Sequence, residues 1–383
     1  MLSFTDSRDK HSRQIYRTTF LLPRICWQII RQPARAAWVI KKASPPLALC
    51  LALSLLSRGV TAAPPPTPTT LRIGIVGLDT SHAIAFTSTL NKGPKKPEDA
   101  PKVAGFRVIA AYPQGSRDIE SSTKRVPEYT EKVREMGVEI VDSIEALLPL
   151  VDAVLLESND GKVHLEQLLP ILKARKPVFI DKPIAASLAD AVRIFDAAKN
   201  AGVPILSASS LRYGATTQEV RAGSLGKVTS AETFSPVNLE PSHPDLFWYG
   251  IHGCESLFTV MGTGCVSVKR SLIEDGRVEV TGTWEDGRTG IFRQENGNER
   301  KGYGGSAKGE KGESKVGAYD GYDPLLFKIL EMFRTGQSPV SAEETLELYA
   351  FMEAADESKR RGGAAVDLKE VLAKARSEAA TKP

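Results

Sequence analysis

Short, almost wholly apolar segments alternate with amphipathic ones between residues 71 and 209, and this rhythm constrains the fold more than any other feature of the chain. The intervening segments have helical spacing, and one opens with Ser187 and Asp190 in a capping-box arrangement. Strands without a polar face must be covered on both sides, so the sequence predicts a parallel, doubly wound α/β sheet of the Rossmann type. The predicted strands cover residues 71–77, 106–113, 138–143, 152–158, 177–183 and 203–209.

The pattern changes after Tyr213, where apolar and polar residues alternate over longer stretches. Such alternation predicts a mostly antiparallel sheet, and two helices close the chain, one over 324–335 and one after Ser341 with Glu344 completing a capping box. The predicted organisation is a Pro-rich linker over 64–70, a Rossmann-type dinucleotide-binding domain over 71–212 and an α+β domain over 213–375.

Residues 1–63 differ from the rest, because an Arg-rich, acid-poor stretch leads into an apolar run over 47–56 and then into small residues. This is the layout of an export signal, with cleavage expected after Ala62, and the apolar run is too short for a membrane span. We therefore expect a periplasmic or otherwise exported protein without a membrane segment once the leader is removed. A misplaced start codon or an uncleaved anchor is the alternative, and a non-functional leader would leave the protein in the cytoplasm.

The composition is that of a globular protein, with 42% hydrophobic and 25% charged residues and a formal charge of +4. Lys and Arg are interspersed with acids instead of forming basic stripes, which argues against a nucleic-acid partner. Beyond the leader lie two cysteines, Cys254 and Cys265. They can pair in an oxidising compartment, but buried free thiols are the commoner outcome for a pair this sparse.

Several landmarks occur in a fixed order, and together they resemble the glucose-fructose oxidoreductase, inositol dehydrogenase and MocA family of Rossmann-type oxidoreductases. The resemblance covers about residues 71–368, and its landmarks are "LRIGIVG", "SNDGKVHLEQLLPILKARKPVFIDKP", "SLRYG", "GSLGKV", "YGIHGCESLFTVMG" and "SAEETLELYAFMEAADESKRRG". It implies a nucleotide-binding domain followed by an open-faced, mostly antiparallel sheet that holds the substrate and often mediates homo-oligomerisation.

The turn after the first strand departs from the dinucleotide-binding pattern, because only Gly77 of three expected glycines is present. A carboxylate at Asp79 about 4 Å from a phosphate would cost on the order of 4 kcal/mol. Asp79 must therefore point away, or the cofactor binds differently or not at all. A simpler interpretation is that Asp79 or Thr80 caps the following helix, which still allows the hydroxyls of Thr80 and Ser81 to bind phosphate.

The second cofactor signal, an acidic residue after the second strand, is absent. Ser116 and Arg117 stand there instead and can receive a 2′-phosphate, which favours NADP over NAD if either binds; Arg117 can equally be a solvated loop residue. By the resemblance, Ser158, Asn159 and His164 fall on the nicotinamide side, although His164 can also be a helix-start residue without a ligand.

Asp181 and Lys182 end a predicted strand at the sheet edge where α/β proteins bind ligands. They match the family's Glu-Lys-Pro element with Asp in place of Glu, and Asp181 is counted with the cofactor-binding residues. The resemblance implies that Lys182 bridges the substrate hydroxyl and the cofactor ribose. The alternative is a surface lysine before a helix-starting proline.

His252 takes the place of the family's catalytic histidine, a residue type that exchanges protons near neutral pH. The aspartate expected four residues earlier is replaced by Trp248. Glu255, one turn later, is the candidate substitute partner, or else a structural residue.

The same part of the chain offers other candidate roles. The resemblance places Arg212 and Tyr213 beside the substrate, and Trp248 and Tyr249 can stack on a sugar or pack in the core. A rival metal site has a spacing that matches no established zinc pattern, so no metal is predicted; its residues would be His243, Asp245, His252 and Glu255.

These features favour an NAD(P)-dependent oxidoreductase that acts on a sugar, polyol or related carbohydrate, with Lys182 and His252 as its acid/base pair. Two alternatives remain open. One is a cofactor-assisted, non-redox carbohydrate enzyme, and the other is a Rossmann-like binding protein that has lost the cofactor.

Overall fold

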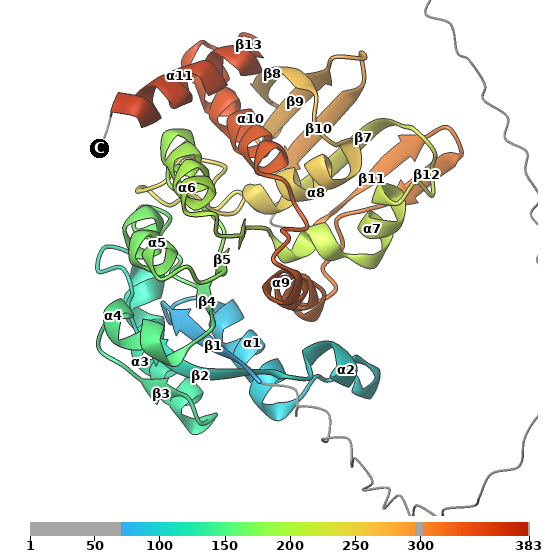
Figure 1. The fold of residues 1–383 in the computed structure, drawn as a ribbon. Coiled ribbons are helices and arrows are strands. Elements are labelled where there is room, and N and C mark those ends of the chain that lie inside the picture. The colour runs from blue at the N-terminus through green and yellow to red at the C-terminus, as the bar shows by residue number, and fades with distance from the viewer. Residues whose placement is uncertain (1–69, 296–301, 382–383) are drawn as a thin grey trace, which may run out of the picture. The chain divides into compact units, whose positions relative to one another are not determined.

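The computed structural model describes residues 70–295 and 302–381. The predicted leader and most of the Pro-rich linker lie outside these ranges, and the two predicted sheets are both present (Figure 1). Within the described part of the chain, no helix has the length and apolar character needed to cross a membrane.

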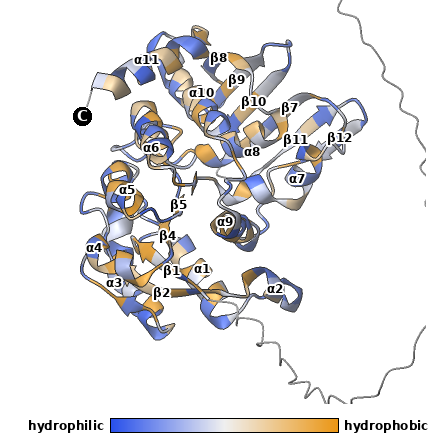
Figure 2. Ribbon diagram, in the orientation of Figure 1, coloured by the Kyte–Doolittle hydropathy of each residue, from blue (hydrophilic) through white to orange (hydrophobic). Residues whose placement is uncertain are grey.

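The first sheet is parallel, with strand order β3-β2-β1-β4-β5-β6, as predicted for a Rossmann domain. Its strands are β1 (Leu71–Val76), β2 (Phe106–Tyr112), β3 (Glu139–Ile140), β4 (Ala153–Leu156), β5 (Val178–Ile180) and β6 (Ile205–Leu206). The residues of β4 and β5 are all buried, and Figure 2 shows the central strands as hydrophobic. The order reverses between β1 and β4, and ligands of such sheets bind at the carboxyl ends of the strands beside that point.

Helices connect these strands: α1 (Ser81–Lys92), α2 (Ala100–Val103), α3 (Glu120–Glu135), α4 (Ile144–Leu147), α5 (His164–Lys173) and α6 (Leu188–Ala201). The predicted cap of α6 is confirmed, because the Ser187 hydroxyl accepts from the Asp190 amide at 3.0 Å. Gly202 ends the same helix in the left-handed conformation, with φ of 64°.

The second sheet has the order β12-β11-β7-β10-β9-β8-β13, and all its pairs are antiparallel except β7 with β10. This confirms the prediction of a mostly antiparallel sheet. Its strands are β7 (Val228–Ser235), β8 (Cys265–Leu272), β9 (Val278–Trp284), β10 (Thr289–Gln294), β11 (Gly304–Gly309), β12 (Gly312–Lys315) and β13 (Val366–Asp367).

The helices of this half are α7 (Ala215–Arg221), α8 (Ile251–Met261), α9 (Asp323–Thr335), α10 (Ala342–Arg360) and α11 (Leu368–Thr381). Every residue of α8 is buried, because the helix packs on β7 and β10 and is covered by α10. Gly253 makes this close approach possible, since a Cβ there would lie 2.5 Å from the Phe292 ring. The predicted cap of α10 is confirmed, with the Glu344 amide donating to Ser341 at 3.1 Å.

Helix α9 packs far from its position in the sequence. Leu326 and Ile329 belong to the same buried hydrophobic cluster as Ile73 and Phe86 of the Rossmann domain, and α9 contacts both α1 and α2. A segment that the sequence assigns to the second domain therefore completes the core of the first.

Candidate active site

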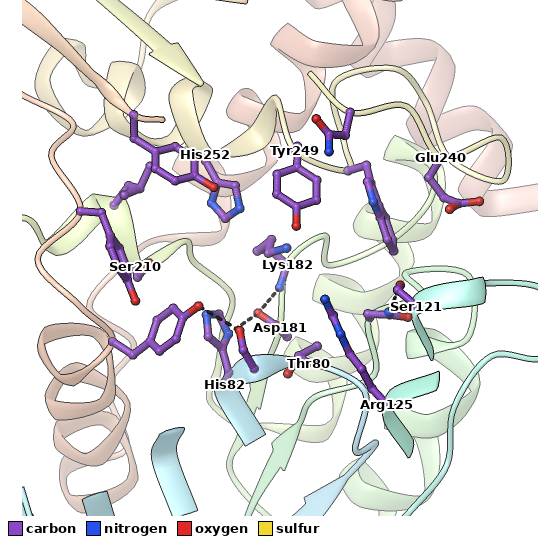
Figure 3. A pocket seen from close by; sticks show the side chains of 18 of the residues that line it. Thr80, His82, Ser121, Arg125, Asp181, Lys182, Ser210, Glu240, Tyr249 and His252 are labelled. Carbon is purple, nitrogen blue, oxygen red and sulfur yellow. Dashed lines mark hydrogen bonds and ion pairs between the residues drawn. The ribbon is translucent and has the colours of Figure 1, made fainter. Parts of the chain in front are cut away.

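A pocket of about 460 Å³ lies at the carboxyl ends of the first sheet's central strands. Segments from both halves of the chain form its wall, including the start of α1, the end of β5 and the start of α8 (Figure 3). Its lining residues are Thr80, Ser81, His82, Glu120, Ser121, Arg125, Asn159, Asp181, Lys182, Ser210, Leu211, Asn238, Leu239, Glu240, Trp248, Tyr249, His252, Tyr303, Tyr319 and Tyr322.

Lys182 and His252, the predicted acid/base pair, line this one pocket although 70 positions separate them. The Lys182 Nζ lies 5.5 Å from the centre of the Tyr249 ring, an arrangement in which the ring face attracts the ammonium. Figure 3 shows Lys182, Tyr249 and His252 around the same space.

His252 is almost buried at the start of α8, and its Nδ1 lies 2.7 Å from the Ser209 hydroxyl. Burial, together with the positive charges of Lys182 and His82, holds the pKa of His252 well below its usual range. The imidazole is therefore neutral at pH 7 and able to accept a proton.

Glu255 does not orient His252. Its carboxylate instead accepts a hydrogen bond from Arg212 Nε, and the orienting contact comes from Ser209, a residue that sequence reasoning missed. Trp248 lines the pocket and packs on the His243 ring, with 5.0 Å between ring centres.

Arg212, Tyr213 and Glu255 are buried outside the pocket lining. The Arg212 guanidinium bonds to Glu255 and, at 2.6 Å, to Glu344, which also pairs with Arg221 at 2.8 Å. A buried arginine needs such partners to offset the loss of water. The geometry thus gives these residues a structural role at the junction of η3 (Ser210–Tyr213), α8 and α10, and their predicted substrate contacts find no support in it.

The turn after β1 keeps the Asp79 carboxylate away from the pocket, although two of the three expected glycines are missing. Gly77 has a φ of 89°, and a Cβ there would lie 2.4 Å from the Ser158 amide nitrogen, so only glycine fits. The Asp79 carboxylate is buried and accepts from the Asn159 amide at 2.9 Å and from the Ser122 hydroxyl at 2.7 Å. Asp79 is absent from the pocket lining, so the condition for phosphate binding, a carboxylate that points away, is met.

The predicted capping role of Asp79 or Thr80 is wrong. No side chain caps α1, because Asp79 binds elsewhere and the Thr80 hydroxyl donates to Glu157 at 2.9 Å. The first-turn amides and the positive end of the helix dipole thus face the pocket, as an anion site requires.

The loop after β2 carries the two residues predicted to bind a 2′-phosphate, Ser116 and Arg117, and neither lines the pocket. The Ser116 hydroxyl donates to Asp160 at 2.9 Å, while Arg117 is exposed and does not line the pocket. Arg125 lines it instead and donates to the Asp79 carbonyl at 3.1 Å. Sequence spacing had no signal for Arg125, since only the fold brings α3 over the β1 turn.

The segment after β4 contributes Asn159 to the pocket, and its buried Oδ1 has no hydrogen-bond partner. Ser158 lies directly behind Gly77, and its buried hydroxyl also lacks a partner. The His164 ring lies between the carbonyls of Ser158 and Ile184, at 2.7 and 3.1 Å, which is the placement of a structural residue.

The rival metal set is not assembled in the part of the chain that the structure describes. His243 accepts from the Gly161 amide at 3.1 Å, and Asp245 pairs with Arg270 at 2.8 Å and with Lys359 at 2.7 Å. Cys254 and Cys265 are both buried free thiols.

Three buried side chains gather at the pocket floor, His82, Glu157 and Asp181; of these, only Asp181 was predicted from the sequence, as a cofactor-binding residue. His82 Nδ1 lies 2.9 Å from an Asp181 oxygen and 3.9 Å from a Glu157 oxygen. Burial, reinforced by the charge of Asp181, raises the pKa of Glu157 well above its usual range. Burial opposes ionisation of Asp181 too, but His82 and Lys182 hold the pKa of that carboxyl below its usual value. The sequence signal that could have identified Glu157 is its position directly after β4, next to the strand that Asp181 follows.

The residues present fit a dinucleotide in its main requirements. The uncapped start of α1, the tight Gly77 turn and the unpartnered buried atoms of Ser158 and Asn159 form a polar cradle, and Arg125 supplies positive charge.

Comparison with known proteins agrees with this geometry. A profile of the oxidoreductase family with an NAD-binding Rossmann fold matches residues 71–209. A 1,5-anhydro-D-fructose reductase from Ensifer adhaerens is 36% identical over 107 residues, which cover 26% of this chain and 32% of the relative. The chain thus matches about a third of that protein's length.

Solved structures share the fold at low identity. The myo-inositol dehydrogenase of Lactobacillus casei, in complex with NAD(H) and myo-inositol, has a TM-score of 0.61 at 17% identity, covering 78% of this chain and 97% of that one. A probable dehydrogenase from Thermotoga maritima has a TM-score of 0.61 at 21% identity, covering 79% and 100%. Residues 71–209 thus match the NAD-binding Rossmann fold of the glucose-fructose oxidoreductase, inositol dehydrogenase and MocA family of oxidoreductases, and the described chain shares its two-sheet architecture with these solved dehydrogenases.

Proposed function

We propose that this protein is an NAD(P)-dependent oxidoreductase that acts on a sugar, polyol or related carbohydrate. The observation that carries the proposal is the meeting of Lys182 and His252 in one pocket that also receives the uncapped start of α1. The family description and the named activities of the relatives point the same way.

The residues divide the work of oxidising a carbinol. A nicotinamide, when bound, supplies the acceptor for the hydride that leaves the carbon. His252, neutral because its pKa is depressed, accepts the hydroxyl proton, and the Ser209 hydroxyl holds its ring in position. The Lys182 ammonium binds the same oxygen and stabilises the negative charge that develops on it as the proton leaves.

The rest of the lining suits a polyhydroxylated ligand. Trp248, Tyr249 and Tyr303 offer ring faces against which the C–H face of a sugar packs, and the tyrosine hydroxyls can exchange hydrogen bonds with its hydroxyls. Glu240 adds an acceptor at the same wall.

The decisive experiment titrates the purified full-length protein with NAD⁺, NADP⁺ and their reduced forms, followed by fluorescence and thermal unfolding. Micromolar binding is expected, with turnover on a panel of sugars and polyols. Absence of binding at millimolar concentrations would overturn the proposal and leave a Rossmann-shaped binding protein. Binding without net oxidation or reduction would favour a cofactor-assisted, non-redox reaction.

The same titration tests the NADP preference predicted from the sequence at Ser116 and Arg117, two residues that do not line the pocket. We also propose export, based on the leader pattern of residues 1–63, which lie outside the described residues. Fractionation of cells that express the full chain tests it, because an exported protein is recovered outside the cytoplasm with a shortened N-terminus.

A further inference from the structure

The floor of the pocket gathers three side chains able to bind a metal: His82, Glu157 and Asp181. One candidate ligand atom from each lies within 4.8 Å of the others, and no other such group of three occurs within residues 70–295 and 302–381. They come from the first turn of α1, the residue after β4 and the residue after β5. His82 and Asp181 line the pocket, so the cluster adjoins the space where a ligand binds (Figure 3).

Two carboxylate oxygens in this cluster lack a hydrogen-bond partner. They are Glu157 Oε1 and Asp181 Oδ2, and both residues are fully buried. The other oxygen of each is held in place: Glu157 Oε2 by the Thr80 hydroxyl at 2.9 Å, and Asp181 Oδ1 by the Lys182 amide at 2.8 Å and by His82 Nδ1 at 2.9 Å, a contact that a bound ion would replace. Buried carboxylate oxygens without a partner are costly, and an ion or ordered water is the usual explanation.

We propose that His82, Glu157 and Asp181 bind one divalent transition-metal ion, Zn²⁺ or Mn²⁺, at the floor of the pocket. One imidazole and two carboxylates form a ligand set suited to these ions, whereas Mg²⁺ takes oxygen ligands and keeps several waters. Three protein ligands leave a coordination position open, as in catalytic metal sites.

The spacing of the ligands is compatible with the ion. Two ligands of a tetrahedral zinc, each about 2.1 Å from the metal, are about 3.4 Å apart. The distances from His82 Nδ1, 2.9 Å to Asp181 Oδ1 and 3.9 Å to Glu157 Oε2, lie on either side of that value, and the unpartnered Oδ2 and Oε1 are the second oxygens of the same two carboxyl groups. Small side-chain shifts are therefore sufficient, and the bonds from Thr80 and Lys182 orient the carboxylates as outer-shell contacts do in metal sites.

Charge balance also favours a cation. Glu157 and Asp181 place two carboxyl groups in a space from which water is excluded. His82, 2.9 Å from Asp181, and the Lys182 ammonium on the pocket side offset part of the negative charge that these groups carry when ionised. A divalent ion would neutralise both ligating carboxylates and present its open position to an oxygen of the bound ligand.

The test uses the full-length protein after treatment with EDTA. Zn²⁺, Mn²⁺ and Mg²⁺ are titrated separately by calorimetry, and bound metal is counted by mass spectrometry after gel filtration. We expect one equivalent of Zn²⁺ or Mn²⁺ and a higher unfolding temperature, with weak binding of Mg²⁺. Less than a tenth of an equivalent, with no change in unfolding temperature, would overturn the proposal.

Glu157→Gln and His82→Asn should weaken binding on the order of 100-fold or more. The matched control is Asp79→Asn, which changes a buried carboxylate of the same turn whose oxygens are both partnered, and it should retain the metal. Equal affinity in all the variants would mean adventitious binding elsewhere and would sink the proposal. If a variant does not fold, Co²⁺ titration of the wild type decides, because a site with a His nitrogen ligand gives visible absorption bands unlike those of hydrated Co²⁺. No nucleotide is added in these experiments, so their result does not depend on the proposed oxidoreductase activity.

Discussion

The wall of the pocket carries Lys182 and His252, and its floor carries His82, Glu157 and Asp181. The two regions differ in how exposed their charged groups are and in what balances those charges. On the wall, Lys182 stays partly exposed and can bind a ligand oxygen, and the neutral His252 can accept a proton from the ligand. On the floor, Glu157 and Asp181 are fully buried, and the neighbouring His82 and Lys182 offset part of their negative charge. The wall has the lysine and histidine expected from the resemblance but has Trp248 in place of the expected aspartate, and on the floor His82 stands in the turn from which two expected glycines are missing.

The largest expected effect is the loss of kcat when Lys182 on the pocket wall is replaced. Lys182→Ala removes the only charged group proposed to contact the reacting oxygen, and kcat should fall by about 10²–10⁴-fold, the range of a lost acid/base group. Nucleotide affinity, measured by fluorescence, should change far less. Lys199→Ala, on the exposed side of α6, is the matched control. An unchanged kcat in Lys182→Ala would exclude the assigned role.

The next largest effect is a loss of stability when Gly77, in the turn after β1, is replaced. Gly77→Ala forces a side chain into a positive φ and against Ser158, so the free energy of unfolding should fall by about 3 kcal/mol or more. Gly93→Ala, at the other end of α1, has a φ of 102° but nothing within 4 Å of its added Cβ. It should cost only about 1–2 kcal/mol in urea unfolding. Equal losses in the two variants would show that contact with Ser158 does not matter.

The buried acid of the turn should be visible in the pH dependence of stability. Burial raises the pKa of Asp79 to about 6. Protonated Asp79 therefore stabilises the folded state below pH 4, and this stabilisation is lost as the pH rises through 6, where the buried group must ionise. Asp79→Asn removes this penalty, and its stability relative to wild type should increase by about 2–3 kcal/mol between pH 4 and pH 7. Urea unfolding at intermediate pH values measures the difference. A constant difference across that range would mean that Asp79 ionises normally.

The smallest effect separates two arginines near the nucleotide cradle. Arg125→Gln removes a positive charge from the pocket lining and should weaken NAD(P) binding by about tenfold, whereas Arg117→Gln, on the exposed loop, should change NAD binding less than twofold. Calorimetric titration with both cofactors gives the comparison. A selective loss of NADP affinity in Arg117→Gln would restore the role predicted from the sequence.

Elements with a local cause were predictable. The apolar strands, the Ser187 and Ser341 caps and the helix over Asp323–Thr335 follow from residues near one another in the chain, and all are present. Lys182 and His252 were found because they occupy family positions, and the fold brings them into one pocket. Arg125, Ser209 and Glu157 could not be found in this way, since each acts through a contact with a distant segment.

The sequence by itself determined the two-sheet architecture, because hydrophobic periodicity is a local property that dictates which faces must be buried. It also determined which strand ends carry polar side chains. Only the tertiary structure decided where those side chains point: Asp79 away from the pocket, Glu255 to Arg212 and His82 to Asp181. The physical reason is that a buried polar group takes whatever partner the packed chain brings within about 3 Å, and that partner lies 80, 43 and 99 positions away, respectively, in these cases.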